Sequence, residues 1–205
     1  MNLVGRERPV SSAPPTDADL MAGLKDGSEP AFRALLLRHR PMVERFLYSL
    51  LWDRAQAEDL TQEVFLRLWL ARERYEPRAP FTCYLYTIAK NLWLHERERR
   101  NHRPPPVSLE EGLSPLAREA AFRALAAEPT LPEQVLFANE RLFRIRQAIA
   151  KLPAEQRLVF TLSHLEGLRY AEIAEVLGVP LGTVKSRMNA AITKLRGHFR
   201  ILEEE

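Results

Sequence analysis

The sequence has a single cysteine, few glycines and no long apolar run, and each scarcity excludes a class of protein. Cys83 alone cannot form an internal disulfide or a cysteine-based zinc site, which favours a reducing compartment. Only 8 of 205 residues are glycine, while alanine, leucine, glutamate and arginine are abundant, so helix is favoured over strand. No stretch approaches the roughly 20 apolar residues of a membrane span, and Met1–Pro15 lacks a signal-peptide core. We therefore expect a soluble, cytoplasmic, helical protein without membrane insertion.

Residues for catalysis or metal binding are scattered along the chain. The sequence contains no glycine-rich phosphate loop, and Ser, His and acidic residues do not assemble into a recognisable triad. Five histidines occur without metal-ligand spacing: His39, His95, His102, His164 and His198. We expect no enzymatic activity, no metal site and no cofactor.

Charge is distributed unevenly along a chain whose net charge is only +3. Lys90–Arg103 has five basic and two acidic residues, whereas Pro104–Val135 has five acidic and two basic residues. Val176–Ile201 has five basic residues and no acid. Two basic segments therefore flank an acidic one, and such a local excess of positive charge is what a phosphate-binding surface needs.

The chain is expected to fold as two small all-α domains. Residues 1–16 are rich in Ser, Pro and charge and predict a disordered tail. The first domain is expected at 17–103 and the second at 133–205, because the segment 104–132 is acidic and rich in proline, which is typical of a semi-extended linker. No segment alternates with the period of a strand over a useful length.

Four helices are expected in the first domain. A short helix starts at Asp17 and ends at Gly27, and Ser28 is the expected N-cap of the second helix, which Pro41 should kink or split. A third helix covers about 53–74, and a fourth covers about 81–100. The third has an apolar stripe at helical spacing, formed by Leu60, Val64, Phe65 and Leu68.

The strongest local pattern lies between Leu168 and Arg196. Tyr170–Leu177 is a short amphipathic helix, Gly178–Pro180 is a tight turn, and Thr183–Arg196 is a basic second helix. This order is typical of a helix-turn-helix, in which the second helix enters the major groove of DNA.

The second helix of this motif carries five residues that are expected to face outward near its start. Arg187 or Lys185 suits a guanine edge, and Asn189 suits adenine. Thr183 and Ser186, with the free N–H groups of the helix, suit phosphates. The alternative is a small packing motif with a solvated basic face, but the turn, the apolar pattern and the absence of acids together favour DNA binding.

A second cluster lies on the helix Asp59–Trp69. Acidic and amide side chains beside Phe65 and Trp69 would suit a protein-docking surface. Taken alone, however, a charged helix face is usually only solvated.

A third cluster combines the basic segment Lys90–Arg103 with the rings of Tyr84, Tyr86 and Trp93. Strand-separated DNA requires this combination, because cations contact phosphates and rings stack on exposed bases. The alternative is that the rings are core and the arginines are solvated.

Several runs of the sequence resemble one protein family. Leu152–Phe160, Tyr170–Ala174 and Gly182–Arg187 resemble region 4 of the extracytoplasmic-function (ECF) sigma factors of bacterial RNA polymerase. Ala57–Leu66 and Leu85–Asn91 resemble region 2 of the same family. The two blocks occur in the family's order on either side of the linker, which is more specific than a helix-turn-helix alone.

The resemblance implies partners and site residues. Region 2 would dock on the clamp helices of the largest polymerase subunit through Asp59, Gln62, Glu63 and Phe65. It would also open the minus-ten element with the loop before Phe81 and five residues of the following helix: Tyr84, Lys90, Asn91, Arg97 and Arg100. Region 4 would bind the flap of the second-largest subunit and contact the minus-thirty-five element through Thr183, Lys185, Ser186, Arg187 and Asn189. An anti-sigma factor would be the regulatory partner, and the linker would thread near the RNA exit channel.

The sequence departs from the family pattern at four positions. Tyr84 stands where tryptophan is common, and His95 stands where aspartate is common. Ala190 and Ile192 stand where the family often has arginines, which should weaken contacts with the DNA backbone of the minus-thirty-five element.

Two alternative functions remain. A polymerase-independent transcription factor would need a dimer interface or an effector domain, and neither a coiled-coil seam nor a ligand-domain pattern is visible. A sigma-like regulator that binds an anti-sigma partner without contacting DNA is favoured by the missing arginines and disfavoured by the retained Lys185-Ser186-Arg187.

Overall fold

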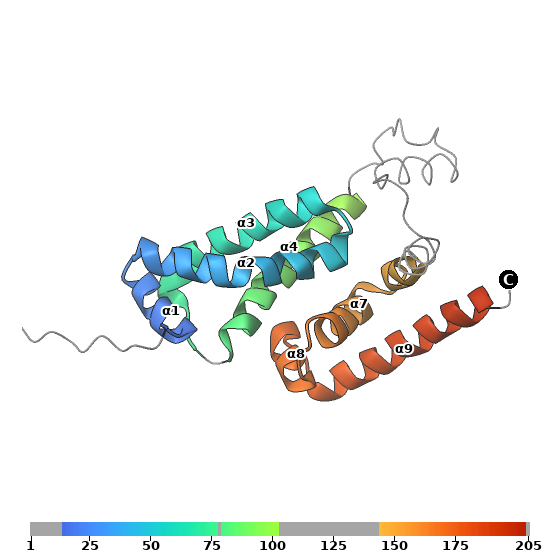
Figure 1. Ribbon diagram of the computed structural model, residues 1–205. Coiled ribbons are helices and arrows are strands. Elements are labelled where there is room, and N and C mark those ends of the chain that lie inside the picture. Colours follow the sequence, from blue (N-terminus) through green and yellow to red (C-terminus); the bar gives the residue numbers. More distant parts are fainter. Residues whose placement is uncertain (1–13, 78, 103–143, 204–205) are drawn as a thin grey trace, which may run out of the picture. The chain divides into compact units, whose positions relative to one another are not determined.

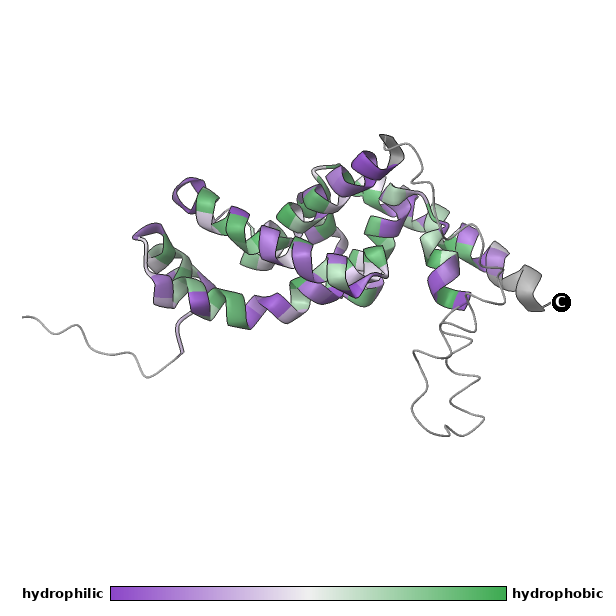
Figure 2. Ribbon diagram, turned by 90° about the horizontal axis from the view of Figure 1, so that it is seen from above, coloured by the Kyte–Doolittle hydropathy of each residue, from purple (hydrophilic) through white to green (hydrophobic). Residues whose placement is uncertain are grey.

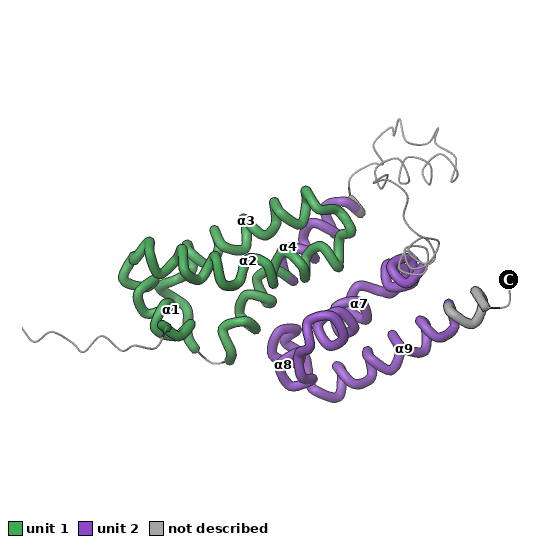
Figure 3. Tube along the Cα trace, viewed as in Figure 1, with its two compact units in different colours: residues 1–89 green, residues 90–205 purple. Residues whose placement is uncertain are grey.

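The structure, a computed structural model, describes residues 14–77, 79–102 and 144–203, and every regular element in these ranges is a helix. The chain divides into two compact units, Met1–Ala89 and Lys90–Glu205 (Figure 3). The all-α prediction is therefore confirmed. The expected tail as far as residue 13 and the expected linker at 104–132 lie outside the described residues. Among the helices that are described, none combines the length and apolarity needed to cross a bilayer.

The first unit begins with two capped helices, α1 (Asp17–Lys25) and α2 (Glu29–Leu51) (Figure 1). The Thr16 hydroxyl accepts the N–H of Asp19 at 3.2 Å, and the Asp19 carboxylate accepts the N–H of Thr16 at 2.9 Å. Each bond satisfies a donor that the helix start leaves free. Thr16, which the composition places in the tail, is thus the N-cap of α1. Ser28 caps α2 as predicted, because its hydroxyl accepts the N–H of Ala31 at 3.3 Å.

Helix α2 continues through Pro41, so of the two predicted outcomes, a kink or a split, the split does not occur. A proline within a helix removes one hydrogen bond to the carbonyl four residues earlier. Leu35 on one side of Pro41, and Val43 and Phe46 on the other, are fully buried. The packing of both halves therefore outweighs the loss of a single bond.

The third helix, α3 (Arg54–Ala71), packs against α2 and continues into a 3-10 turn, Arg72–Arg74. The Asp53 carboxylate caps α3 by accepting the N–H of Gln56 at 3.1 Å. The predicted stripe is confirmed at Val64, Phe65 and Leu68, which are buried.

The fourth helix, α4 (Phe81–His102), starts where the sequence predicts and contributes residues to both units. In the first unit the Tyr86 ring meets the Phe46 ring edge-on, with 5.0 Å between the ring centroids. Burying a phenylalanine side chain of this kind stabilises a fold by about 1.5–3 kcal/mol. The start of α4 is thereby anchored in the core.

The second unit contains a helix at 144–150, α7 (Ala154–Phe160), a π-helical turn (Thr161–Leu165), α8 (Tyr170–Leu177) and α9 (Leu181–Glu203). The Arg157 guanidinium donates to the carbonyls of Ala150 and Leu152, and so closes the end of the helix at 144–150. Figure 2 shows hydrophilic and hydrophobic residues interspersed along the helical ribbons, as expected of amphipathic helices. One apolar cluster joins the helix at 144–150 to α9 through Ala148, Ile149, Leu152, Ala191 and Leu195.

Candidate nucleic-acid and protein interfaces

Helices α8 and α9 form a helix-turn-helix, as the sequence predicts. Helix α8 ends at Gly178, whose φ of 67° lies in the left-handed region. The N–H of Gly178 and the N–H of Val179 both donate to the carbonyl of Ala174, at 2.9 and 3.1 Å. Glycine adopts this conformation without strain, which lets the chain reverse within three residues. Helix α9 then starts at Leu181, and one side of its first turns is exposed.

The start of α8 is fixed by a local ion pair. The Glu172 carboxylate accepts the backbone N–H of Arg169 at 2.8 Å and the Arg169 guanidinium at 3.0 Å. The side-chain hydrogen bond with Arg169 holds the pKa of Glu172 below its usual value. Glu172 is therefore ionised at neutral pH and engaged at the helix start, where the helix dipole favours a carboxylate.

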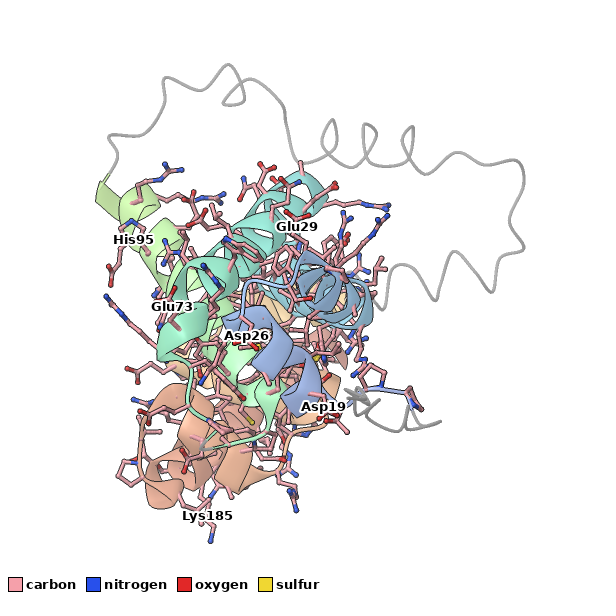
Figure 4. The ribbon with its side chains drawn as sticks, turned by 90° about the vertical axis from the view of Figure 1, so that its left-hand side faces the viewer. Asp19, Asp26, Glu29, Glu73, His95 and Lys185 are labelled. Carbon is pink, nitrogen blue, oxygen red and sulfur yellow. The ribbon has the colours of Figure 1, made fainter. Side chains whose placement is uncertain are left out.

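Three of the five residues expected to contact DNA from α9 are exposed: Lys185, Ser186 and Asn189. The Lys185 side chain points away from the helix into solvent (Figure 4). Thr183 is partly buried, and its carbonyl accepts the hydroxyl of Ser186 at 3.0 Å. The opposite side of α9 forms the core through Val184 and Met188, so the motif turns a polar, basic face outward.

Arg187 differs from these residues because its side chain turns toward α7. Its Nη2 lies 2.7 Å from Oε2 of Glu155, and its side chain is only 23% exposed, against 66% for Glu155. Successive residues are ~100° apart on a helix, so Arg187 and Lys185 lie on opposite flanks of the outer face. The sequence grouped them together; the tertiary structure separates them.

The basic half of α4 is partly exposed. Asn91 and Arg97 face solvent, whereas the Lys90 ammonium donates to the Val176 carbonyl of the same unit at 2.9 Å. Desolvation lowers the pKa of Lys90. Arg100 pairs with Glu96 at 3.2 Å. His95, the departure from the family pattern, lies on the surface of α4 (Figure 4).

Glu96 organises the arginines that follow Arg97. It accepts bonds from Arg99 and Arg100, each one helical turn away. Burial raises the pKa of Glu96, but these two hydrogen bonds outweigh it and leave the pKa below its usual value. Glu96 is therefore an ionised partner for two arginines, and part of the basic charge of this segment is neutralised locally.

Of the three rings associated with this segment, only Tyr84 is partly exposed. Tyr86 and Trp93 are each 2% exposed and belong to the core, which is the alternative that the sequence left open. The Tyr84 ring meets the Tyr75 ring at 4.9 Å between centroids, and desolvation raises the pKa of Tyr84. Part of the Tyr84 ring therefore packs in the core, and the rest is exposed to solvent.

The outer face of α3 carries the residues expected to dock on a protein, except for one that is buried. Asp59 and Gln62 are exposed, and Glu63 pairs with Arg67 at 2.8 Å. Phe65, however, is 2% exposed and lies in the core, because it falls on the same helical side as Val64 and Leu68. Phe65 therefore supports α3 from beneath and is not exposed on its outer face.

Two leucines that the sequence did not single out lie on the same outer face. Leu66 is 50% exposed and Leu70 is 69% exposed. They follow Gln62 at intervals of four residues, and Leu66 follows Glu63 at an interval of three, so these side chains are neighbours on one helix face. The signal was present in the sequence, because both leucines fall outside the buried stripe of α3. We call Asp59, Gln62, Glu63, Leu66 and Leu70 the α3 outer face.

The described residues contain no group of three or more His, Cys, Asp or Glu side chains arranged to hold a metal ion. These residues form instead a face of α3 with acidic and apolar side chains, a basic helix α4 with the partly exposed ring of Tyr84, and the helix-turn-helix of α8 and α9.

Family models match both units. The model "Sigma-70 region 2" matches residues 35–103, and the model "Sigma-70, region 4" matches residues 142–195. The ECF RNA polymerase sigma factor SigL of Mycobacterium tuberculosis is 35% identical over 177 residues, which cover 86% of this chain and 93% of SigL. The chain belongs to the ECF RNA polymerase sigma factors. Its sigma-factor function is therefore to bind core RNA polymerase and to direct promoter recognition, DNA opening and initiation.

Other relatives agree with this membership. The ECF sigma factor SigW of Bacillus subtilis is 29% identical over 179 residues, covering 87% of this sigma factor and 94% of SigW. Two solved structures share its fold. CnrH, solved in complex with the cytosolic domain of CnrY, has a TM-score of 0.65 and 23% identity, covering 90% of this sigma factor and 97% of CnrH. RpoE of Bartonella quintana, solved with the anti-sigma factor NepR, has a TM-score of 0.57 and 23% identity, covering 83% and 97%.

Proposed function

We propose that this sigma factor binds its three main targets through three different surfaces. The α3 outer face docks on the clamp helices of the largest polymerase subunit. The exposed side of α4 holds the opened minus-ten element, and the first turns of α9 contact the minus-thirty-five element. The observation that carries the proposal is the position of α9, whose exposed Lys185, Ser186 and Asn189 directly follow the Gly178 turn.

The chemistry of the α3 outer face favours a protein partner over DNA. Asp59 and Glu63 would repel phosphates, whereas Leu66 and Leu70 offer apolar area that gains free energy only when a partner covers it. Phe65 and Leu68 anchor α3 in the core beneath this face, so the helix presents it rigidly.

The chemistry of α4 favours single-stranded DNA. Asn91 and Arg97 are exposed, and the partly exposed Tyr84 ring can stack on an unpaired base. Arg100 is also exposed, although its ion pair with Glu96 neutralises part of its charge. Phosphates and bases of the displaced strand would therefore meet different residues of the same helix.

Further partners follow from the proposed role. The second unit would bind the flap of the second-largest polymerase subunit, and the sigma factor would act in the cytoplasm, where the polymerase is. The shared fold with RpoE, which was solved with the anti-sigma factor NepR, supports an anti-sigma partner for this chain as well.

The test is run-off transcription with purified core polymerase and promoters selected from a randomised library. We expect product only when the sigma factor is added. Glu63→Arg should abolish association with core polymerase, because it reverses the charge in the middle of the α3 outer face. Glu63→Gln, which avoids repulsion with Arg67, should weaken association less.

The matched control is Asp26→Arg, which makes the same charge change at an exposed position after α1 (Figure 4). It should leave association intact. Normal association of Glu63→Arg would reject the docking assignment. A footprint by the protein alone, with no transcript from any selected promoter, would reject the sigma mechanism in favour of a polymerase-independent factor.

A further inference from the structure

Arg187 is held by an acidic residue of a different helix. Glu155 is the second residue of α7, and its carboxylate lies 2.7 Å from the Arg187 guanidinium on α9. No acid occurs in Val176–Ile201, so α9 brings none of its own to this stretch. The tertiary structure therefore supplies to this stretch of α9 a negative charge that the stretch itself lacks.

The geometry of this pair is set by two packed helices. Helices α7 and α9 contact each other, and Leu158 and Val159 of α7 are buried, as is Met188 beside Arg187. Glu155 lies in the first turn of α7, so the packing of the two helices fixes the backbone that carries each partner of the pair.

The ion pair between Glu155 and Arg187 should affect the position of the Arg187 side chain more than the stability of the fold. Ion pairs that include an exposed side chain contribute little to stability, and Glu155 is 66% exposed. An arginine side chain, however, has many rotamers, and the contact with Glu155 selects among them. A guanidinium carries five N–H donors, so one bond to Glu155 leaves the others for a base edge or a phosphate.

We propose that Glu155 is a positioning residue for promoter recognition, whose carboxylate orients the Arg187 guanidinium so that its remaining donors meet the minus-thirty-five DNA. The inference rests on the proposed function of α9. It differs from simple charge balance, because removing an acid close to DNA should by itself raise affinity for every sequence, whereas removing a positioning residue should lower discrimination between sequences.

The experiment measures the discrimination ratio, which is the affinity of the full-length holoenzyme for a selected promoter divided by its affinity for the same promoter with a scrambled minus-thirty-five element. Arg187→Ala should lower this ratio by roughly 5- to 150-fold if Arg187 contacts a base. Glu155→Gln should lower it by about 3- to 10-fold while affinity for the scrambled promoter rises or stays the same. In the Arg187→Ala background, Glu155→Gln should have no further effect on the ratio.

The matched control is Glu175→Gln, which removes an exposed carboxylate from α8 of the same motif. It should leave the ratio unchanged. An unchanged or higher ratio for Glu155→Gln would overturn the proposal, and so would an equal loss in the Arg187→Ala background, because Glu155 would then act through the fold.

The failure of this inference is distinguishable from that of the proposed function. If Arg187→Ala leaves the ratio unchanged while Lys185→Ala lowers it, α9 still reads DNA and only the role of Glu155 and Arg187 is rejected. If neither variant changes affinity for either promoter, the proposed DNA contact of α9 fails as well.

Discussion

The helix pairs α2–α3 and α8–α9 both have very short connections, yet they present different surfaces. Trp52 and Asp53 join the first pair, and Gly178, Val179 and Pro180 join the second. In the first pair α3 packs along the long helix α2. Far from the connection, the rings of Phe32 and Trp69 still contact each other, with 5.2 Å between their centroids. In the second pair α8 has only 8 residues and α9 has 23. The first pair offers a long face on α3, whereas in the second pair the side of α9 that carries Lys185, Ser186 and Asn189 is exposed.

The chemistry of the two outer faces follows the same division. The α3 outer face combines acidic side chains with exposed leucines, and α9 combines basic and polar side chains. Burial of apolar area is the main source of affinity between proteins, while release of counterions from phosphates is the main source of affinity for DNA. The two helices therefore differ in the side chains opposite their buried stripes, which are acidic and apolar on α3 and basic and polar on α9.

The double variant Leu66→Asp/Leu70→Asp should have the largest effect. Both side chains are exposed, so the fold should tolerate the change, but affinity for core polymerase should fall by about 3 kcal/mol because two apolar contacts are replaced by charges. Quantitative binding to core polymerase measures this. The matched control is Leu37→Asp at a similarly exposed leucine of α2. Equal loss in the control would mean that the α3 outer face has no special role.

Gly178→Ala should destabilise the second unit by about 1–2 kcal/mol, because a residue with a Cβ is strained at a φ of 67°. A Cβ at this position would meet no atom within 4 Å, so the cost is confined to the backbone. Chemical denaturation measures it. The matched control is Gly182→Ala, which has equal space in the first turn of α9 and should be neutral or slightly stabilising. Wild-type stability of Gly178→Ala would show that the turn tolerates another conformation.

Ala190→Arg should strengthen DNA binding by α9 by up to about 1 kcal/mol at low salt. Ala190 is partly buried on the flank of α9 that also carries Arg187, where a longer basic side chain would extend toward the DNA backbone. The slope of log affinity against log salt should steepen by roughly 0.9 if one phosphate is gained. A salt titration of promoter binding measures the slope. An unchanged slope would place this flank away from the DNA.

Asp17→Asn should have the smallest effect. It should lower the free energy of unfolding of the first unit by roughly 0.5–1 kcal/mol and leave the binding of core polymerase and of DNA unchanged. Asp17 pairs with Arg38 at 2.7 Å and with His39 at 3.0 Å. Burial raises the pKa of Asp17, but the bonds from His39 and Arg38 outweigh it and leave the pKa below its usual value. A carboxyl with a lowered folded-state pKa stabilises the fold above its unfolded pKa, and this contribution is lost as pH falls through the folded pKa.

Denaturation of both proteins as a function of pH tests this sign. The difference between wild type and Asp17→Asn should be constant at neutral pH and vanish in acid, below the usual range of an aspartate. A difference that persists there would assign the effect to packing instead of charge.

Much of the fold follows from local patterns. Ser28 and Asp53 mark helix starts, Gly178 marks a turn, and the helix-turn-helix follows from residues close together in the sequence. The candidate surfaces were harder to predict. Phe65 and Leu66 are adjacent apolar residues, yet one is core and the other is exposed, because the position of α2 decides which side of α3 is covered.

The helical class, the order of the two regions and the family can be predicted from the sequence, because capping residues, apolar periods and motif order are local properties of the chain. Which side chains are exposed depends on the packing of the helices. This packing buried Tyr86 and Trp93, exposed Leu66 and Leu70, and placed Glu155 against Arg187 across α7 and α9. The physical reason is that exposure and ion pairing depend on distances between residues far apart in sequence, and helix packing alone sets those distances.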